Sequence, residues 1–139
     1  MTPQALAEAC AEAMWAEDRA SAGLGMRIVR VAPGECEMTM RVEERMVNGH
    51  GICHGGFIFA LADSAFAFSC NSRNRATVAA GADIEYLAPC REGDVLIAEG
   101  EVEQHQRRPA LGGHALGRRT AIGHGQSGAV VDLDPAAGR

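Results

Sequence analysis

The chain has 139 residues, a length that suits one compact domain and leaves little room for two. Its composition, 47% hydrophobic and 22% charged with a formal net charge of -5, is typical of a soluble globular protein and argues against a polynucleotide partner. Residues 1–20 lack the basic region of a secretory signal, and the longest apolar run, 55–62, is far shorter than the ~20 residues of a membrane span. Five cysteines, an odd number without a CxxC pair, favour reduced thiols and the cytoplasm.

The first part of the chain predicts a helix followed by a β-hairpin. Thr2 and Pro3 are a hydroxyl cap and a first-turn proline, and the Ala-rich segment behind them predicts a short amphipathic helix that ends near 21–25. The segments 26–31 and 35–42 alternate between apolar and polar residues and are separated by Ala-Pro-Gly. They therefore predict two paired strands with one buried face.

The segment 56–71 predicts a central helix that is covered on most sides, because its large apolar side chains point in all directions. At ~1.5 Å per residue the helix would be about 24 Å long, enough to cross a sheet of several strands. The segments 77–87 and 94–104 predict two more strands, separated by a turn at 89–93. This order predicts an α+β fold in which an antiparallel sheet wraps around one long helix.

The last segment, 107–139, differs in composition from the rest of the chain. It is rich in Gly, Arg, Ala and His, and no helical or strand period persists in it, so we expect no regular secondary structure there. It contains a GxGxxG pattern at 123–128, which indicates a nucleotide site only between a strand and a helix, and neither is expected. We therefore divide the chain into a domain at 1–106 and an atypical tail at 107–139.

Several candidate site residues lie in the loop and helix start at 48–56. A helix start leaves backbone N–H groups unpaired, and Gly55 and Gly56 would bring such donors close to a substrate oxygen, as in an oxyanion hole. The alternative is that the two glycines only form a tight turn into the helix. His54 either orients a substrate carbonyl or caps the helix, and Asn48 either forms a turn or directs its amide into the site.

Asp63 is a carboxylate within the apolar helix. Its helical neighbours offer no partner for a charge, and an apolar setting raises the pKa of a carboxyl, which makes Asp63 a candidate general base or nucleophile if a cleft reaches it. The alternative is an Asp that is hydrogen-bonded to the backbone or to one of three arginines, Arg45, Arg73 or Arg75. Ser64 lacks the GxSxG context of a serine nucleophile.

A metal site is a further hypothesis for this stretch. His50, Cys53 and His54 are closely spaced, but a zinc site usually needs a fourth ligand or a second ligand pair, and the sequence shows neither at regular spacing. We therefore expect no metal.

Asn48, the run His54-Gly55-Gly56 and the run Leu61-Ala62-Asp63 followed by Ser-Ala-Phe-Ala resemble the hotdog-fold acyl-CoA thioesterases, most closely the phenylacetate-pathway (PaaI-type) branch. The resemblance extends from the N-terminal helix to the fourth expected strand. It implies a hotdog fold, subunits that pair so that each active site lies between them, and commonly a homotetramer made of two dimers. It implies no metal or redox cofactor.

The resemblance also implies roles for individual residues. Asp63 would be the nucleophile or general base, and Gly55 of the partner subunit would supply the N–H that polarises the thioester carbonyl. Asn48 and His54 would help to hold the carbonyl or the attacking water. Further candidates for substrate binding are Gly56 and, as contacts of the CoA phosphates, Arg73 and Arg75.

The implied reaction is hydrolysis of phenylacetyl-CoA or hydroxyphenylacetyl-CoA type thioesters to the free acid and CoA. The alternative is a catalytically inactive hotdog protein that still binds acyl-CoA. A hotdog dehydratase or hydratase fits less well, because those relatives use a His with an acidic residue in a different motif context, whereas His54 precedes a glycine pair.

Two features depart from the family pattern. Some relatives place a Ser or Thr near Gly81, where it assists the water, but this chain has Ala79-Ala80-Gly81 there. The family also continues after the fourth strand with two strands inside the sheet, and the sequence of 107–139 resembles neither. We hypothesise that the reading frame of the gene shifts near Gln106, and an intact frame on resequencing the gene would refute this.

Overall fold

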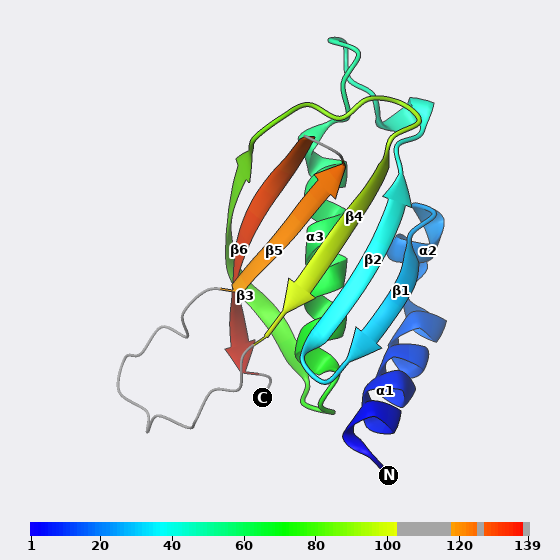
Figure 1. The fold of residues 1–139 in the computed structure, drawn as a ribbon, viewed down its shortest axis with the longest axis vertical. Helices are drawn as coiled ribbons and strands as arrows, with labels where there is room; N and C mark the ends of the chain where they lie inside the picture. Colours follow the sequence, from blue (N-terminus) through cyan, green and yellow to red (C-terminus); the bar gives the residue numbers. More distant parts are fainter. Residues whose placement is uncertain (103–117, 125–126, 138–139) are drawn as a thin grey trace.

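A six-stranded antiparallel sheet curves around one long helix (Figure 1). The computed structural model describes residues 1–102, 118–124 and 127–137, with side chains for 1–79 and 84–102. The helices are α1 (Pro3–Glu17), α2 (Arg19–Gly23) and α3 (Gly55–Asn71), with a 3-10 turn at Glu44–Met46. The strands are β1 (Arg27–Ala32), β2 (Glu35–Arg41), β3 (Thr77–Tyr86), β4 (Val95–Glu101), β5 (Arg118–His124) and β6 (Ser127–Ala137).

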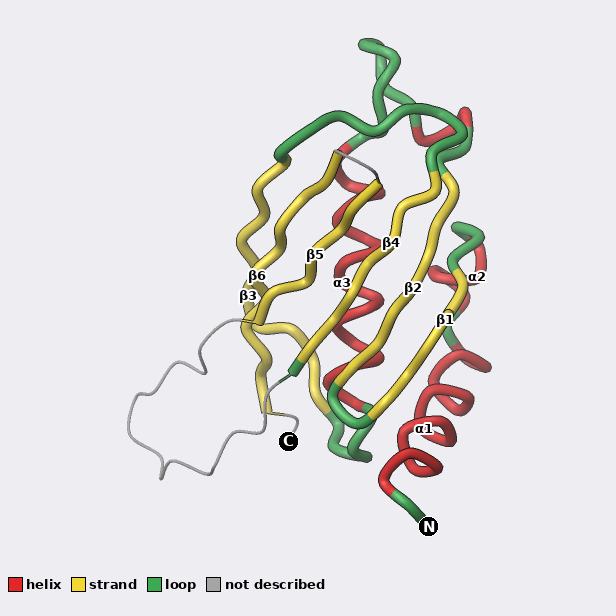
Figure 2. The backbone as a smooth tube through the Cα atoms, viewed as in Figure 1, coloured by secondary structure: helices red, strands yellow, loops and turns green. Residues whose placement is uncertain are grey.

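The strand order is β1-β2-β4-β5-β6-β3, so β1 and β3 form the two edges of the sheet. Helix α3 crosses the concave face and contacts β2, β3 and β4, while α1 lies beside the β1 edge (Figure 2). The predicted α+β fold with a sheet around one helix is therefore confirmed. Among the described residues, no helix combines the length and the apolar character needed to cross a membrane.

The expected N-terminal helix forms, but it is broken into two. The Thr2 hydroxyl accepts a hydrogen bond from the Ala5 N–H at 3.1 Å, and Pro3 occupies the first turn, as predicted. Asp18 ends α1 and caps α2, because its carboxylate accepts a bond from the Ser21 N–H at 2.9 Å. The Ser21 hydroxyl then contacts the Ser64 hydroxyl at 2.8 Å, which ties α2 to α3.

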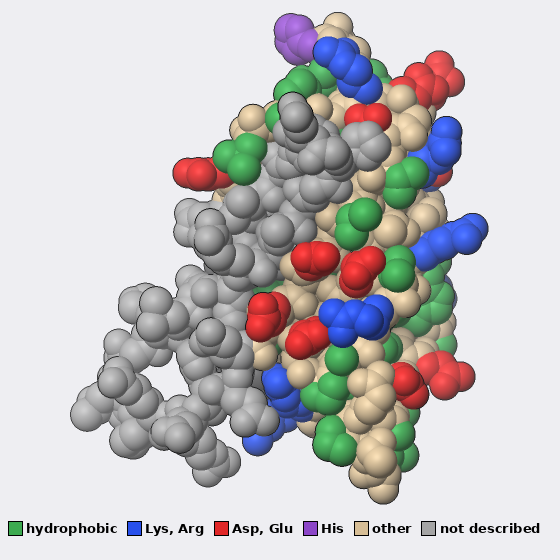
Figure 3. Space-filling view, in the orientation of Figure 1, with side chains coloured by type: hydrophobic (Ala, Val, Ile, Leu, Met, Phe, Trp, Pro, Cys, Tyr) green, Lys and Arg blue, Asp and Glu red, His purple; other side chains and the backbone are tan. Residues whose placement is uncertain are grey.

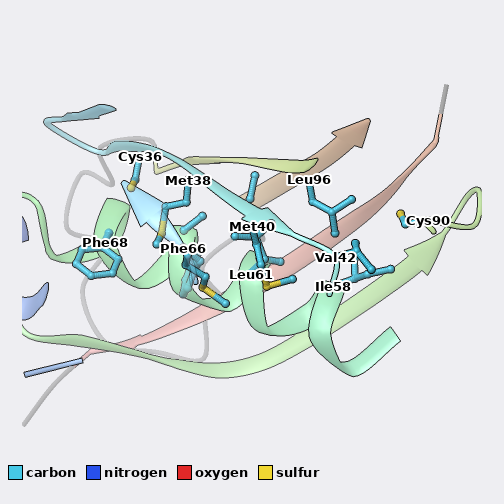
Figure 4. Close-up of a cluster of buried hydrophobic side chains, with 14 of the residues drawn as sticks. Cys36, Met38, Met40, Val42, Ile58, Leu61, Phe66, Phe68, Cys90 and Leu96 are labelled. Atoms are coloured by element: carbon cyan, nitrogen blue, oxygen red, sulfur yellow. The ribbon is translucent and has the colours of Figure 1, made fainter. Parts of the chain in front are cut away.

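The core lies between the inner face of the sheet and α3 (Figure 4). Strands β2 and β4 alternate between buried and outward-facing residues, which confirms the predicted buried face of the hairpin. The largest fully buried side chains include Met38, Met40, Leu61, Phe66, Phe68 and Leu96. Gly100 of β4 lets the strand approach the helix, because a Cβ there would lie 2.7 Å from the Ala65 carbonyl oxygen.

The outer face of the sheet carries an unusual concentration of negative charge. Figure 3 shows acidic side chains gathered on this face. Glu37 lies directly opposite Glu99, and Glu35 opposite Glu101, in the pairing of β2 with β4. Arg30 forms an ion pair with Glu35 at 2.9 Å, and this bond and the neighbouring glutamates raise the pKa of the Arg30 guanidinium.

The expectation that 107–139 forms no strands is wrong for the part of this segment that the structure describes. Strand β5 pairs with β4 and β6, and β6 pairs with β3, so both lie inside the sheet. A strand between two neighbours receives backbone hydrogen bonds from both sides, and this pairing does not require an alternating sequence. The division of domains at 106 and the shift of reading frame stay hypotheses.

Candidate active site

The start of α3 leaves one backbone donor free. His54 is the N-cap, and its Nδ1 accepts a hydrogen bond from the Gly56 N–H at 3.2 Å. The Phe57 N–H donates to the His54 carbonyl at 3.0 Å. Within the described part of the chain, the Gly55 N–H has no acceptor. A free N–H at the positive end of a helix is suited to bind a developing negative charge.

The cap also defines the state of the His54 ring. Because Nδ1 accepts a hydrogen bond, the proton of the neutral ring lies on Nε2, which can then act as a donor. The His54 side chain is exposed, and its ring packs edge-on against Phe57 with centroids 6.3 Å apart. The capping role that we considered from the sequence is therefore seen, and it leaves Nε2 available to a ligand.

Tyr86, the last residue of β3, contacts the same helix start. Its hydroxyl donates to the Gly55 carbonyl at 3.0 Å. A Cβ at Gly55 would lie 2.7 Å from both Cζ and Oη of Tyr86, so no side chain fits at this position without movement. Sequence reasoning missed this residue, and the only available signal was an aromatic residue at the end of an expected strand.

Asn48 organises the loop that precedes α3. Its Oδ1 accepts hydrogen bonds from the N–H groups of His50 at 2.9 Å and Ile52 at 3.4 Å, and its own N–H donates to the Ile52 carbonyl at 2.8 Å. The turn role is therefore seen. No described residue accepts a hydrogen bond from the Asn48 side-chain amide, which keeps both of its N–H donors for a ligand.

Asp63 lies on a face of α3 that the described residues leave open to solvent. Its side chain is exposed in the single chain, while Leu61, Ala62 and Ala65 beside it are buried. The apolar surroundings nevertheless raise the pKa of the Asp63 carboxyl above its usual 3.8 by desolvation. The helix is therefore covered on most sides, as predicted, with the carboxylate in the open stripe.

The arginine partners considered for Asp63 are engaged elsewhere or stand apart. Arg45 donates to the Glu43 carboxylate at 2.6 Å and to the Gly23 carbonyl at 2.8 Å. Arg73 donates to the backbone carbonyls at 33 and 102, at 2.9 and 3.2 Å. In the part of the chain that the structure describes, Asp63 makes no hydrogen bond or ion pair.

The contacts of Arg73 also bear on its expected role with CoA. Its guanidinium lies against Gly34 and ties the β1–β2 turn to the end of β4, so two of its donors already hold the fold together. Arg75 is exposed, and its side chain has no partner among the described residues. Arg75 is thus the better placed of the two expected phosphate contacts.

The cluster considered for a metal is divided between surface and interior. His50 and His54 are exposed, whereas Cys53 is buried and its N–H donates to the Cys90 carbonyl at 2.7 Å. Burial raises the pKa of the Cys53 thiol to about 11, which disfavours the thiolate that would bind a metal. The described residues contain no group of three or more His, Cys, Asp or Glu side chains that could hold a metal ion.

Gly55 and Asp63 are too far apart on one helix to act on the same thioester. Asp63 lies eight positions after Gly55, which corresponds to ~12 Å along the helix axis. A reacting carbonyl needs its oxygen within ~3 Å of the N–H and its carbon close to the base or nucleophile. A site that uses both residues therefore takes them from two chains.

Comparisons with known proteins identify the family of the chain. Residues 50–110 match the thioesterase superfamily. The chain is 44% identical over 96 residues to the acyl-coenzyme A thioesterase PaaI of Escherichia coli, an alignment that covers 69% of this chain and 68% of that protein. The chain belongs to the PaaI-type hotdog thioesterases. It is also 32% identical over 77 residues to human acyl-coenzyme A thioesterase 13, covering 54% of this chain and 55% of that protein.

Solved structures confirm the hotdog fold of this PaaI-type thioesterase. The Escherichia coli PaaI protein from the phenylacetic acid degradation operon has a TM-score of 0.87 and 32% identity, covering 99% of this chain and 97% of that chain. A mutant of the phenylacetic acid degradation protein PaaI from Thermus thermophilus has a TM-score of 0.72 and 30% identity, covering 85% and 97%. A hypothetical thioesterase from Streptococcus pneumoniae with coenzyme A shares the fold, with a TM-score of 0.67 and 22% identity, covering 81% and 87%.

Proposed function

We propose that this thioesterase hydrolyses acyl-CoA thioesters of the phenylacetyl-CoA or hydroxyphenylacetyl-CoA type to the free acid and CoA. The observation that carries the proposal is one helix on which the Gly55 N–H and the Asp63 carboxylate, whose pKa is raised, both lack a partner among the described residues. The Escherichia coli relative is the acyl-coenzyme A thioesterase PaaI, a protein from the phenylacetic acid degradation operon, and this supports the class of substrate.

The site would be completed by a second copy of the chain. Strand β3 pairs with β6 on one side only among the described strands, and apolar side chains are exposed along it, with Val78 at 66% and Leu87, directly after the strand, at 65% exposure. A long apolar edge strand is a template for pairing. A two-fold dimer formed along β3 and the open stripe of α3 would place Gly55 of one copy against Asp63 of the other. Such dimers would pair further into a homotetramer.

In this site Asp63 activates the water or itself attacks the thioester, and the start of α3 stabilises the negative charge of the tetrahedral intermediate. Asp63 takes a proton from water, whose oxygen adds to the thioester carbon, or the carboxylate itself attacks that carbon. The carbonyl oxygen becomes negative and accepts the Gly55 N–H, with Nε2–H of His54 and the amide of Asn48 as further donors. The C–S bond then breaks, and the CoA thiolate takes up a proton. Where the carboxylate is the nucleophile, a water molecule then hydrolyses the resulting acyl–Asp63 anhydride to the free acid and regenerates Asp63. A raised pKa makes the Asp63 carboxylate a stronger base.

The remaining assignments concern the CoA and the compartment. We assign contacts with the CoA phosphates to Arg75, because an exposed guanidinium without a partner is free to bind them. All five cysteines are free thiols, which favours the cytoplasm.

Thiol release from phenylacetyl-CoA tests the proposal. The parent, Asp63→Asn and, as a control for the loss of one carboxylate, the exposed Glu17→Gln are compared at equal concentration. We expect release by the parent and Glu17→Gln, a loss of roughly 10²- to 10⁴-fold in Asp63→Asn, and a loss of about one to two orders of magnitude in His54→Ala. Full activity of Asp63→Asn would refute its role. A folded parent that binds phenylacetyl-CoA without releasing thiol would instead support the inactive acyl-CoA-binding protein.

A further inference from the structure

Two consecutive glycines are a flexible way to start a catalytic helix. Glycine has the widest conformational freedom of any residue, so Gly55 and Gly56 by themselves would leave the direction of the Gly55 N–H poorly defined. An oxyanion donor is effective only when it is held in place before the charge develops. The helix start therefore requires restraints from outside the glycine pair.

The structure supplies restraints at both ends of the peptide group that directly follows the Gly55 N–H in the chain. The peptide that joins Gly55 to Gly56 donates its N–H to His54 Nδ1 at 3.2 Å and accepts at its carbonyl from the Tyr86 hydroxyl at 3.0 Å. The Tyr86 ring also fills the space where a side chain at Gly55 would lie. His54 restrains the peptide from within the loop, and Tyr86 restrains it from strand β3.

We propose that Tyr86 is a positioning residue for the oxyanion donor: its hydroxyl and ring fix the peptide after Gly55 and so aim the free Gly55 N–H at the substrate carbonyl. This role rests on the proposed thioesterase function. Tyr86 does not act on the substrate itself, because its hydroxyl proton is directed to the Gly55 carbonyl. The contact also joins the helix start to β3, the strand that we assign to the dimer, so pairing of two copies and alignment of the donor are linked.

The replacement Tyr86→Phe isolates the hydrogen bond, because it keeps the ring. We expect kcat to fall roughly two- to tenfold, the effect of one neutral hydrogen bond, with KM changed by less than about twofold. Tyr86→Leu removes the ring as well and should lower kcat further. The matched control is Thr39→Val, which removes a hydroxyl elsewhere in the sheet and should leave kcat unchanged. Thr39 is half-buried, lies on the outer face of β2 and pairs with Ile97.

A double substitution tests the contact independently of the hydroxyl. Gly55→Ala keeps the backbone N–H but places a methyl group against the Tyr86 ring. Tyr86→Ala removes this clash, so the combined variant should lose less activity than the product of the two single losses. Losses that simply multiply would show that the two residues do not interact.

These measurements separate the two levels of the proposal. An active parent with unchanged kcat in Tyr86→Phe would overturn the positioning role and leave the thioesterase intact. A folded parent without thiol release would overturn both. A rise in KM at constant kcat in Tyr86→Phe would also contradict positioning, since it would indicate a contact with bound substrate.

Discussion

The separation of Gly55 from Asp63 along one helix predicts that two defective variants restore activity to each other when they share a dimer. Gly55→Ala damages the helix start, because the new Cβ lies 2.7 Å from the Tyr86 ring, and Asp63→Asn removes the base. If each site takes Gly55 from one copy and Asp63 from the other, a mixed dimer contains one intact site and one doubly damaged site.

The size of the effect follows from counting sites. When equal amounts of the two variants are unfolded and refolded together, about half of the dimers are mixed, so about one quarter of all sites are intact. If both residues instead acted within one chain, no site would be intact. The expected thiol release from phenylacetyl-CoA is therefore about one quarter of that of the parent in the first case, and background in the second.

A second mixture provides the control. The double variant, with both substitutions on one chain, is refolded with an equal amount of the parent. If each site is shared between two chains, about one quarter of all sites are intact, because only dimers of two parent chains have complete sites. If each site lies within one chain, about one half of all sites are intact. Background activity in the first mixture, together with half activity in the second, would refute the shared site.

Three further predictions concern stability and reactivity. Gly100→Ala should lower the free energy of unfolding in urea by about 1–3 kcal/mol, because its Cβ would lie 2.7 Å from the Ala65 carbonyl oxygen. The control Gly23→Ala, whose Cβ would meet no atom within 4 Å, should be neutral or stabilising. Equal free energies of unfolding for the two variants would contradict this reasoning. Burial raises the pKa of the Cys36 thiol to about 12, so this thiol should react with a thiol reagent at neutral pH only on unfolding. Rapid reaction of Cys36 in the native state would contradict this. Asp63→Asn should be more stable to heat than the parent at neutral pH. The Asp63 carboxyl has a higher pKa in the folded than in the unfolded state, so the parent loses stability as the pH rises from 3.8 through the folded pKa. The extra stability of Asp63→Asn should therefore vanish below that pH range. Extra stability that persists there would have another cause.

The sequence alone was sufficient to predict the central helix and to single out its carboxylate, Asp63. The apolar residues of 56–71 point in all directions, and this pattern identified both a buried helix and the exception at Asp63. The alternation in 35–41 likewise identified the buried face of β2. In these segments the local pattern and the tertiary packing agree, which is why a period alone was enough.

The sequence was insufficient where distant segments determine the outcome. Strands β5 and β6 have little period of their own and are specified by their neighbours in the sheet. The contact between Tyr86 and Gly55 joins residues 31 positions apart, and no local pattern reports it. The sequence suggested Arg73 as a contact of the CoA phosphates or a partner of Asp63, but the fold brings backbone carbonyls from two other segments to its guanidinium.

The open stripe on α3 and the raised pKa of Asp63 have a common origin. The described residues of a single chain leave the face of the helix that carries the carboxylate exposed, and covering that face with apolar side chains would desolvate the charge further and raise its pKa more. A second copy related by a two-fold axis would instead bring the start of its own α3, whose partial charge is positive and whose Gly55 N–H has no acceptor among the described residues. That donor would oppose the desolvation and favour the ionised carboxylate. The feature that makes Asp63 unfavourable in one chain therefore makes it suited to a site shared by two.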